Sequence, residues 1–377
     1  MSIVRLAETT CIKQLTKGSK IILVYGPRQA GKTTLVKNII AQSGLKSLYL
    51  NADLARNEAQ LSQRDEKKLA ELTAGYEMLV IDEAQRVPEI GLVLKIISDE
   101  LPNLKVIATG SSSFDLANKV SESLTGRKRV FHLMPLMLNE IIDGRNKQEL
   151  DRDIENILLY GLYPEVYTAA TLSDKRDVLD EICESYLFKD IFTLGNVKYT
   201  LKIRDLLRLI AFQAGQQVSM NELSQSLSIN RETVERYIEL LEKAFIIFRL
   251  SAYNRNLRKE VTKMDKIFFY DIGIRNSIID NLKPLNQRND VGQLWENFLV
   301  AERRKQLLYN NSKALTYFWR IYTGAEIDYV EESGEGLIGY EIKWGNTKPR
   351  IPKVWTDEYK GDFKLIDRSN YLDWLLY

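Results

Sequence analysis

The sequence predicts an α/β fold whose first domain is built on a parallel sheet, and three observations favour it. Short apolar runs alternate with helical patterns over the first part of the chain. A loop containing two glycines follows the first apolar run and precedes a helix. Two carboxylates end a later apolar run, as expected where functional side chains gather at the carboxyl edge of parallel strands.

The expected elements of this domain alternate as a doubly wound sheet requires. Helices are predicted near 32–42 and 89–99. The predicted strands are, in chain order, 20–25, 47–51, 78–82, 105–109 and 129–133.

The loop after the first strand fits the pattern G-x-x-x-x-G-K-[ST], in which backbone N–H groups and a helix N-terminus bind phosphate. Lys32 is expected to bridge the β- and γ-phosphates of ATP, and the Thr33 hydroxyl to ligate Mg²⁺. The residues expected to bind ATP here are Gly26, Pro27, Arg28, Gln29, Ala30, Gly31, Lys32, Thr33 and Thr34.

Three further segments offer side chains to a γ-phosphate. Asp82 is expected to hold Mg²⁺ through water and Glu83 to orient or deprotonate the attacking water, although Asp-Glu also ends ordinary strands. Ser111 or Ser112, in VIATGSSSF, is a candidate contact to the γ-phosphate, or part of a serine-rich turn. Arg127, in SLTGRKR, is a candidate arginine finger reaching a neighbouring subunit, or a solvated surface charge.

Composition excludes several classes of protein. The 377 residues are 45% hydrophobic and 28% charged, which is typical of globular domains, and the net charge of +2 creates no global field for nucleic acid. Cys11 and Cys183 are too few for a disulfide framework or a zinc site. The absence of a long apolar run or leader pattern predicts a cytoplasmic protein without a membrane partner. His132, among apolar residues, is expected to be structural.

The middle of the chain is expected to be helical, between boundaries near 143–153 and 281–290. Residues 219–243 predict two helices joined by a turn, and the stretch 249–266 carries an excess of basic residues suited to phosphate backbones. This order is typical of a winged helix, with Arg231, Glu232, Thr233 or Arg236 on the exposed face. The alternative is a buried second helix that joins domains or binds protein.

The C-terminal part predicts a helix near 292–308 and strands at 315–321, 326–330 and 337–343. Its candidate site residues are Glu296, Asp328, Glu341 and Lys343, and this set is similar to the PD-(D/E)xK nuclease pattern, with Ile327 in place of the proline. That pattern implies carboxylates holding a divalent metal and a lysine that positions water. Three carboxylates so close would repel one another unless a cation or a lysine neutralises them.

Across nearly its whole length the chain resembles a prokaryotic group of AAA+-like ATPases with an uncharacterised C-terminal domain. The motifs that carry the resemblance are GPRQAGKTT, TGSSSF, HLMPLMLNE, YGLYPEVY, YLFKDI, FFYDIG, QLWENFLV, YFWR, EIDYV and YEIKW. The resemblance implies that the serine-bearing strand lies between the P-loop and Asp-Glu strands, and it strengthens the case for Arg127. We therefore expect an AAA+-like domain at 1–145, a helical and winged-helix region at 146–283 and a restriction-endonuclease-like domain at 284–377.

The leading functional hypothesis is ATP hydrolysis coupled to DNA engagement, in a chain that can form homo-oligomers. In that hypothesis the nuclease-like domain cuts or grips nucleic acid. The alternative is an ATP-controlled switch that acts through protein partners and carries an inactive nuclease-like domain. A third hypothesis is an ATPase that remodels proteins.

Overall fold

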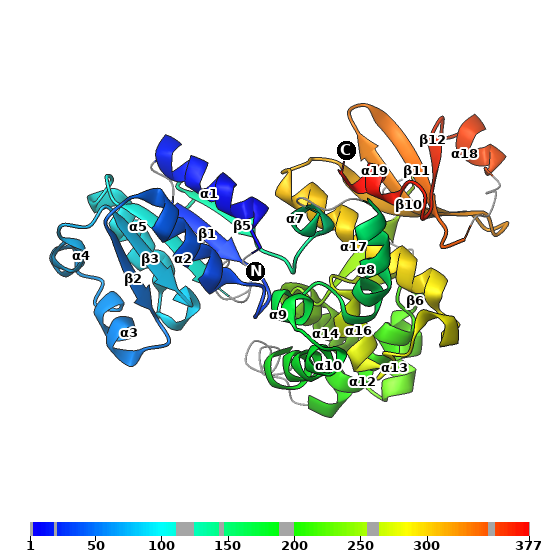
Figure 1. Ribbon diagram of the computed structural model, residues 1–377, viewed down its shortest axis with the longest axis horizontal. Helices are drawn as coiled ribbons and strands as arrows, with labels where there is room; N and C mark the ends of the chain where they lie inside the picture. The colour runs from blue at the N-terminus through cyan, green and yellow to red at the C-terminus, as the bar shows by residue number, and fades with distance from the viewer. Residues whose placement is uncertain are drawn as a thin grey trace. The chain divides into compact units, whose positions relative to one another are not determined.

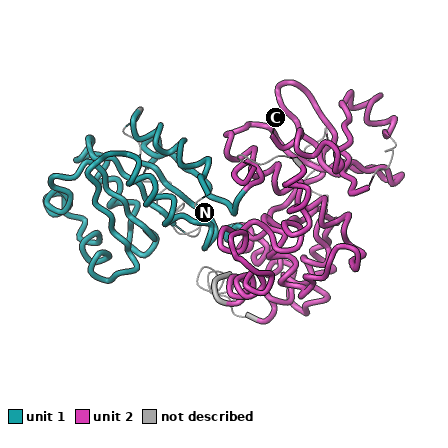
Figure 2. Tube along the Cα trace, viewed as in Figure 1, with its two compact units in different colours: residues 1–136, 243–245 teal, residues 137–242, 246–377 magenta. Residues whose placement is uncertain are grey.

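The computed structural model describes residues 3–18, 21–110, 124–142, 147–187, 200–254, 264–345 and 351–376. The chain forms two compact units (Figure 2): unit 1 comprises residues 1–136 and 243–245, and unit 2 comprises residues 137–242 and 246–377. Among the described residues, no helix has the length and apolar character needed to cross a membrane.

Unit 1 contains a five-stranded parallel sheet with the order β2-β3-β4-β1-β5 (Figure 1). Its strands are β1 (Ile21–Tyr25), β2 (Ser47–Asn51), β3 (Met78–Asp82), β4 (Lys105–Gly110) and β5 (Lys128–His132). The central strands β1 and β3 are buried along their whole length, which is why they appear as unbroken apolar runs. The order confirms that β4, which leads into the serine-rich segment, lies between the P-loop strand and the Asp-Glu strand.

The helices of unit 1 lie alongside this sheet (Figure 1). They are α1 (Leu6–Lys17), α2 (Lys32–Ser43), α3 (Ala55–Leu61), α4 (Glu66–Thr73), the short 3₁₀ turn η1 (Ala84–Arg86) and α5 (Ile90–Glu100). The predicted helices near 32–42 and 89–99 are thereby confirmed as α2 and α5. Helix α1 packs on α2, where the buried Glu8 carboxylate accepts a hydrogen bond of 3.1 Å from Asn38 Nδ2.

Unit 2 begins with helices, as the sequence predicts for the middle of the chain. These are α7 (Leu138–Ile141), α8 (Lys147–Tyr160), α9 (Pro164–Thr168), α10 (Leu172–Glu181), the π-helical η2 (Ile182–Leu187), α12 (Thr200–Phe212), α13 (Met220–Leu227), α14 (Arg231–Lys243), α16 (Ile272–Ile278) and the 3₁₀ turn η3 (Leu285–Gln287). Apolar residues at helical spacing in α12 are buried as predicted: Ile203, Leu206, Leu207, Ile210 and Ala211. The predicted pair of helices over 219–243 is confirmed as α13 and α14, and the Ser219 hydroxyl caps α13 by accepting from the Glu222 N–H at 3.3 Å.

A seven-stranded mixed sheet runs through the rest of unit 2, in the order β12-β11-β10-β9-β7-β8-β6. Its strands are β6 (Gln217–Val218), β7 (Ile247–Ala252), β8 (Asp265–Phe269), β9 (Leu315–Arg320), β10 (Glu326–Ser333), β11 (Gly336–Ile342) and β12 (Asp362–Ile366). Helices α17 (Val291–Tyr309), α18 (Lys353–Asp357) and α19 (Tyr371–Leu376) accompany it. Because β7 pairs in parallel with β9, the strands that follow α12 and the C-terminal strands share one sheet.

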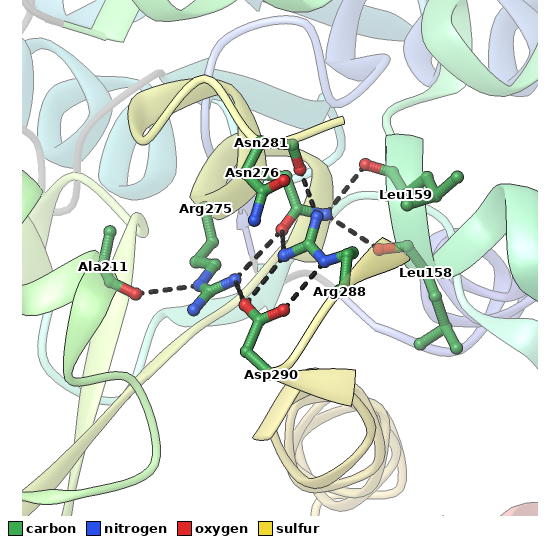
Figure 3. Close-up of polar contacts among 8 residues, drawn as sticks. All are labelled: Leu158, Leu159, Ala211, Arg275, Asn276, Asn281, Arg288 and Asp290. Atoms are coloured by element: carbon green, nitrogen blue, oxygen red, sulfur yellow. Dashed lines mark hydrogen bonds and ion pairs between the residues drawn. The ribbon is translucent and has the colours of Figure 1, made fainter. Parts of the chain in front are cut away.

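A buried polar network fastens α16 to the rest of unit 2 (Figure 3). The Asp290 carboxylate, at the start of α17, accepts from Arg275 Nη1 at 2.5 Å and from Arg288 Nη2 at 2.8 Å. Arg275 also donates to the Ala211 carbonyl at 2.8 Å, and Asn276 donates to two carbonyls at the end of α8. The network therefore ties α12, α16 and α17 together through charge-assisted hydrogen bonds, and the neutral amide of Asn276 ties α8 to α16.

Candidate functional site

The loop between β1 and α2 has the backbone conformation that its glycines allow. Gly31 precedes the first residue of α2 with φ of 93°, in the left-handed region that favours glycine. A Cβ atom on Gly26 would lie 1.9 Å from the Leu133 carbonyl oxygen, so no larger residue fits there without moving the backbone. The loop therefore delivers its N–H groups and the N-terminus of α2 to one point at the carboxyl edge of the sheet.

Lys32 and Arg5 hold the loop from two sides. The buried Lys32 ammonium donates to the Gly26 carbonyl at 3.0 Å and to the Pro27 carbonyl at 2.8 Å. The Arg5 guanidinium, also buried, donates to the Ala30 carbonyl at 2.7 Å and to the Met134 carbonyl at 2.6 Å. Arg5 thus joins the phosphate-binding loop to the chain that follows β5, a role that the sequence analysis missed.

The Asp82 carboxylate, at the end of β3, collects three hydroxyl groups. Thr33 Oγ1 donates to Asp82 Oδ2 at 2.7 Å, and Tyr49 donates its hydroxyl to the same oxygen at 2.7 Å. Thr109, near the end of β4, donates to the other oxygen, Oδ1. Burial and the hydrogen bond to Asp82 raise the pKa of Tyr49, so this hydroxyl keeps its proton and remains a donor.

Glu83 is held beside Asp82 in a defined orientation. Its backbone has φ of 54°, and its N–H donates to Thr109 Oγ1 at 3.1 Å. Its carboxylate accepts from Gln85 Nε2 at 2.5 Å. Thr109 therefore fixes both acidic residues. Thr109 follows the apolar residues of β4, near the carboxyl end of the strand. That position is the signal by which the sequence could have identified Thr109 as a site residue.

The remaining residues predicted for the ATP site fall into two groups. Ser111 and Ser112 lie outside the described residues. Arg127 lies just before β5, at the opposite edge of the parallel sheet from the loop that follows β1, and it pairs with Asp99 at 3.1 Å. Since a parallel sheet separates its two edges by the length of its strands, Arg127 does not reach the P-loop of its own chain.

His132 packs near an aromatic ring, and the two cysteines are free thiols. Burial lowers the pKa of His132, whose ring lies near that of Tyr25, in agreement with the predicted structural role. Cys11 and Cys183 are free thiols, as predicted. Both are buried, and burial raises the pKa of both thiols.

In unit 2 the four residues predicted for the nuclease-like site come together. Lys343 Nζ lies 2.7 Å from Glu341 Oε1 and 3.7 Å from Asp328 Oδ2. Glu296 joins them through Lys266, a residue of β8 that the sequence assigns to the basic stretch 249–266. Burial, opposed in part by Lys266, raises the pKa of Glu296 to about 7. Burial and the neighbouring Asp328 also raise the pKa of Glu341.

The predicted three-carboxylate metal site stays a prediction. Among the described residues, no group of three His, Cys, Asp or Glu side chains is arranged to hold a metal ion. The buried Lys266 lies beside these carboxylates, and its ammonium pairs with Glu296 at 3.1 Å and with Glu326 at 2.7 Å. Lys266 and Lys343 thus supply positive charge beside Glu296, Asp328 and Glu341.

Comparison with known proteins places the chain among relatives from several prokaryotes. One is the uncharacterized protein Rv2008c of Mycobacterium tuberculosis, which is 31% identical over 331 residues, or 87% of this chain and 71% of the relative. The chain belongs to the Rv2008c family. An uncharacterized protein of Methanocaldococcus jannaschii is 24% identical over 369 residues, covering 92% of this chain and 80% of that protein.

Three family models match successive parts of this Rv2008c-family chain. The model described as AAA domain matches residues 18–142, and domains of unknown function match 151–285 (DUF8612) and 291–363 (DUF4143). A solved Walker-type ATPase of Pyrococcus abyssi is 13% identical with a TM-score of 0.49, covering 74% of this chain and 96% of its own. The AAA match, together with the P-loop and the parallel sheet of unit 1, identifies an AAA-type P-loop ATPase domain.

Proposed function

We propose that unit 1 binds ATP with Mg²⁺ at the carboxyl edge of the sheet and hydrolyses the bond between the β- and γ-phosphates of ATP. The observation that carries this is the 2.7 Å hydrogen bond between Thr33 Oγ1 and Asp82 Oδ2. It brings the hydroxyl of the loop and the carboxylate of β3 to one point, where their oxygens suit a hard cation either directly or through water. Mg²⁺, when bound, neutralises charge on the β- and γ-phosphate oxygens.

The side chains have separate roles in this proposal. The loop N–H groups bind the β-phosphate, and Lys32 leaves its two loop carbonyls to contact the phosphates. Glu83 accepts a proton from, or orients, the attacking water. Gln85 and Thr109 position Glu83, through its carboxylate and its backbone N–H respectively.

The test is a pair of variants measured for both binding and turnover. Lys32→Ala removes the cation that stabilises phosphate charge, so ATP affinity and phosphate release both fall. Glu83→Gln keeps binding within about threefold and lowers phosphate release by about 10²–10⁴-fold, the contribution typical of a general base. Lys37→Ala is the matched control, because Lys37 is an exposed lysine of the same helix. Phosphate release at the wild-type rate by Lys32→Ala would overturn the proposal.

A second proposal is that unit 2 contacts the phosphate backbone of DNA through a winged helix. The order α12-β6-α13-α14-β7-β8, in which β6 and β7 both pair with β8, is the order of that motif and supports it. Val234, Tyr237 and Ile238 bury one face of α14, while Arg231 and Arg236 are exposed. Arg231 pairs with Glu235 at 2.8 Å, so this helix offers little net positive charge for reading bases.

The charge for DNA binding would therefore come from Arg255, Arg258 and Lys259, which lie outside the described residues. Replacing all three by alanine should make the salt dependence of DNA affinity shallower, because fewer counterions are released on binding. Fluorescence anisotropy over a salt series measures this slope. The control variant replaces the exposed Lys67 and Lys68 of α4 by alanine. A slope equal to that of the wild type would favour the alternative function, a switch acting on protein partners.

We also propose that the C-terminal part has the PD-(D/E)xK nuclease fold. The order α17-β9-β10-β11-α18-β12 supports it, with β9, β10 and β11 antiparallel and β12 parallel to β11. Asp328 on β10 and Glu341 on β11 take the positions that the pattern expects on two neighbouring strands. This fold does not by itself imply cleavage, because function depends on the chemistry of the site.

A further inference from the structure

Charged side chains gather in unit 2 where β8, β10, β11 and α17 meet. Two of the carboxylates, Glu326 and Asp328, are two residues apart on β10, and both face Lys266. Each side chain of the group forms an ion pair with at least one other member. The group, called the acidic cluster below, consists of Glu296, Glu326, Asp328, Glu341, Lys266 and Lys343.

Lys266 lies inside the acidic cluster. Its Nζ is 3.1 Å from Glu296 Oε1, 2.7 Å from Glu326 Oε1 and 4.0 Å from Asp328 Oδ1. The side chain is 3% exposed, and its ammonium also lies 5.4 Å from the centre of the Phe318 ring. One positive charge thus faces three carboxylates contributed by α17 and β10.

Lys343 neutralises the other side of the acidic cluster. It pairs with Glu341 and faces the second oxygen of Asp328, which also accepts a hydrogen bond of 2.8 Å from the Ile342 N–H. Each oxygen of the Asp328 carboxylate therefore faces one lysine. Arg320 adds a further positive charge, with its Nη1 atom 3.6 Å from Glu326 Oε2.

A divalent cation does not fit this arrangement. Such a cation needs several oxygens at about 2.0–2.6 Å, and the Lys266 ammonium stands among the oxygens that would have to close around it. A metal ion next to the ammonium would also meet a like charge at short range in a poorly solvated site. Lys266 is held in a strand between β6 and β7, so its backbone cannot withdraw without breaking the sheet.

We propose that Lys266 permanently takes the place of the divalent cation, so that the acidic cluster is neutralised by lysine and binds no metal in the wild-type chain. This proposal rests on the proposed nuclease-like fold, which implies a metal at this place, and it is independent of ATP hydrolysis in unit 1. Removing the ammonium leaves Glu296, Glu326 and Asp328 without their common partner. Their oxygens then form a cation site that the wild-type protein lacks.

The test measures Mn²⁺ binding by the full-length chain without nucleotide, from the electron paramagnetic resonance signal of free Mn²⁺. Lys266→Met keeps most of the side-chain volume and removes the charge, and it should bind one Mn²⁺ at least about tenfold more tightly than the wild type. Adding Asp328→Asn to Lys266→Met should abolish the gain. Lys364→Met is the matched control: it removes one positive charge from an exposed lysine of the same sheet, outside the acidic cluster, so its Mn²⁺ affinity should stay near that of the wild type.

Two results would overturn the proposal. One is Mn²⁺ binding by the wild-type chain that Asp328→Asn alone abolishes, since it would place a metal in the cluster beside Lys266. The other is a folded Lys266→Met chain that binds Mn²⁺ no better than the wild type. If Lys266→Met does not fold, the comparison of the wild type with Asp328→Asn decides the question, and absence of a cluster-dependent site in that pair supports the proposal. Failure of ATP hydrolysis changes neither result.

Discussion

Replacing Asp290 by asparagine should destabilise unit 2 strongly, because Asp290 is the anion shared by two buried guanidinium groups (Figure 3). The side chains of Arg288 and Arg275 are 0% and 3% exposed, so neither can turn to water when its partner loses its charge. Burial alone would raise the pKa of Asp290, yet the hydrogen bonds from Arg288 and Arg275 outweigh it and lower that pKa. The carboxylate is thus stabilised as an anion.

The size of the effect follows from these contacts. Asp290 accepts three charge-assisted hydrogen bonds of 2.5, 2.8 and 2.8 Å, and such bonds contribute about 1.5–3 kcal/mol each. Asparagine keeps one acceptor oxygen but places an NH₂ group against a guanidinium. Removing one partner of a buried ion pair lowers the free energy of unfolding by about 3–5 kcal/mol. For a unit of this size, that lowers the midpoint of thermal unfolding by roughly 6–20 °C.

Thermal and urea unfolding, followed by far-ultraviolet circular dichroism, measures this change. The control is Asp280→Asn, in the same unit, where an 80% exposed side chain pairs with Arg176 at 2.7 Å. Loss of that exposed pair should cost about 1 kcal/mol or less. If Asp290→Asn lowers the free energy of unfolding no more than Asp280→Asn does, the network is not a source of stability and this reasoning is wrong.

Three other predictions concern groups elsewhere. Glu296 binds its proton more tightly in the folded chain, because its pKa rises from the ordinary 4.5 to about 7. The free energy of unfolding of unit 2 should therefore fall as pH rises between these values, and Glu296→Gln should reduce that fall in urea titrations. Arg5→Met should loosen the phosphate-binding loop and weaken ATP binding about tenfold or more by isothermal titration, and unchanged affinity would exclude this role. Arg127→Ala should retain ATP binding and lose phosphate release, with partial recovery on mixing with Lys32→Ala chains; normal release by Arg127→Ala alone would exclude a finger.

The elements that the sequence predicted well are those whose local pattern matches their final environment. Strands β1 and β3 are buried on both faces, so each appears in the sequence as an unbroken apolar run, which predicts a buried strand. Helix α14 has Val234, Tyr237 and Ile238 buried on one face, and its helical spacing made the whole span recognisable. The loop from Gly26 to Thr33 was predictable because phosphate binding requires particular residues at fixed offsets.

Residues that act across long stretches of chain were missed. Arg5 donates to the Ala30 and Met134 carbonyls, which are 25 and 129 positions away, and a lone arginine before a helix carries no sign of such partners. Thr109 is one of several hydroxyls near the end of β4, and its contact with Asp82 depends on β4 lying beside β3. In the sequence, the serines that follow are the more conspicuous candidates. Neighbouring strands decide such contacts, and residue type alone does not.

Lys266 shows why the chemistry of the C-terminal site could not be obtained from its own segment. The pattern of Glu296, Asp328, Glu341 and Lys343 lies within one stretch of about fifty residues, and taken alone it predicts a metal site. Lys266 belongs to β8, in the basic stretch assigned to DNA binding, and it faces Glu296 and Glu326 because β7 pairs with both β8 and β9. Strand β7 pairs in parallel with β9, with Ser251 opposite Tyr317 and Ala252 opposite Phe318. This pairing therefore decides that a lysine of β8 lies among the carboxylates of the C-terminal site. In the sequence Lys266 belongs to a basic stretch suited to nucleic acid. In the fold it is the buried counter-ion of a carboxylate cluster.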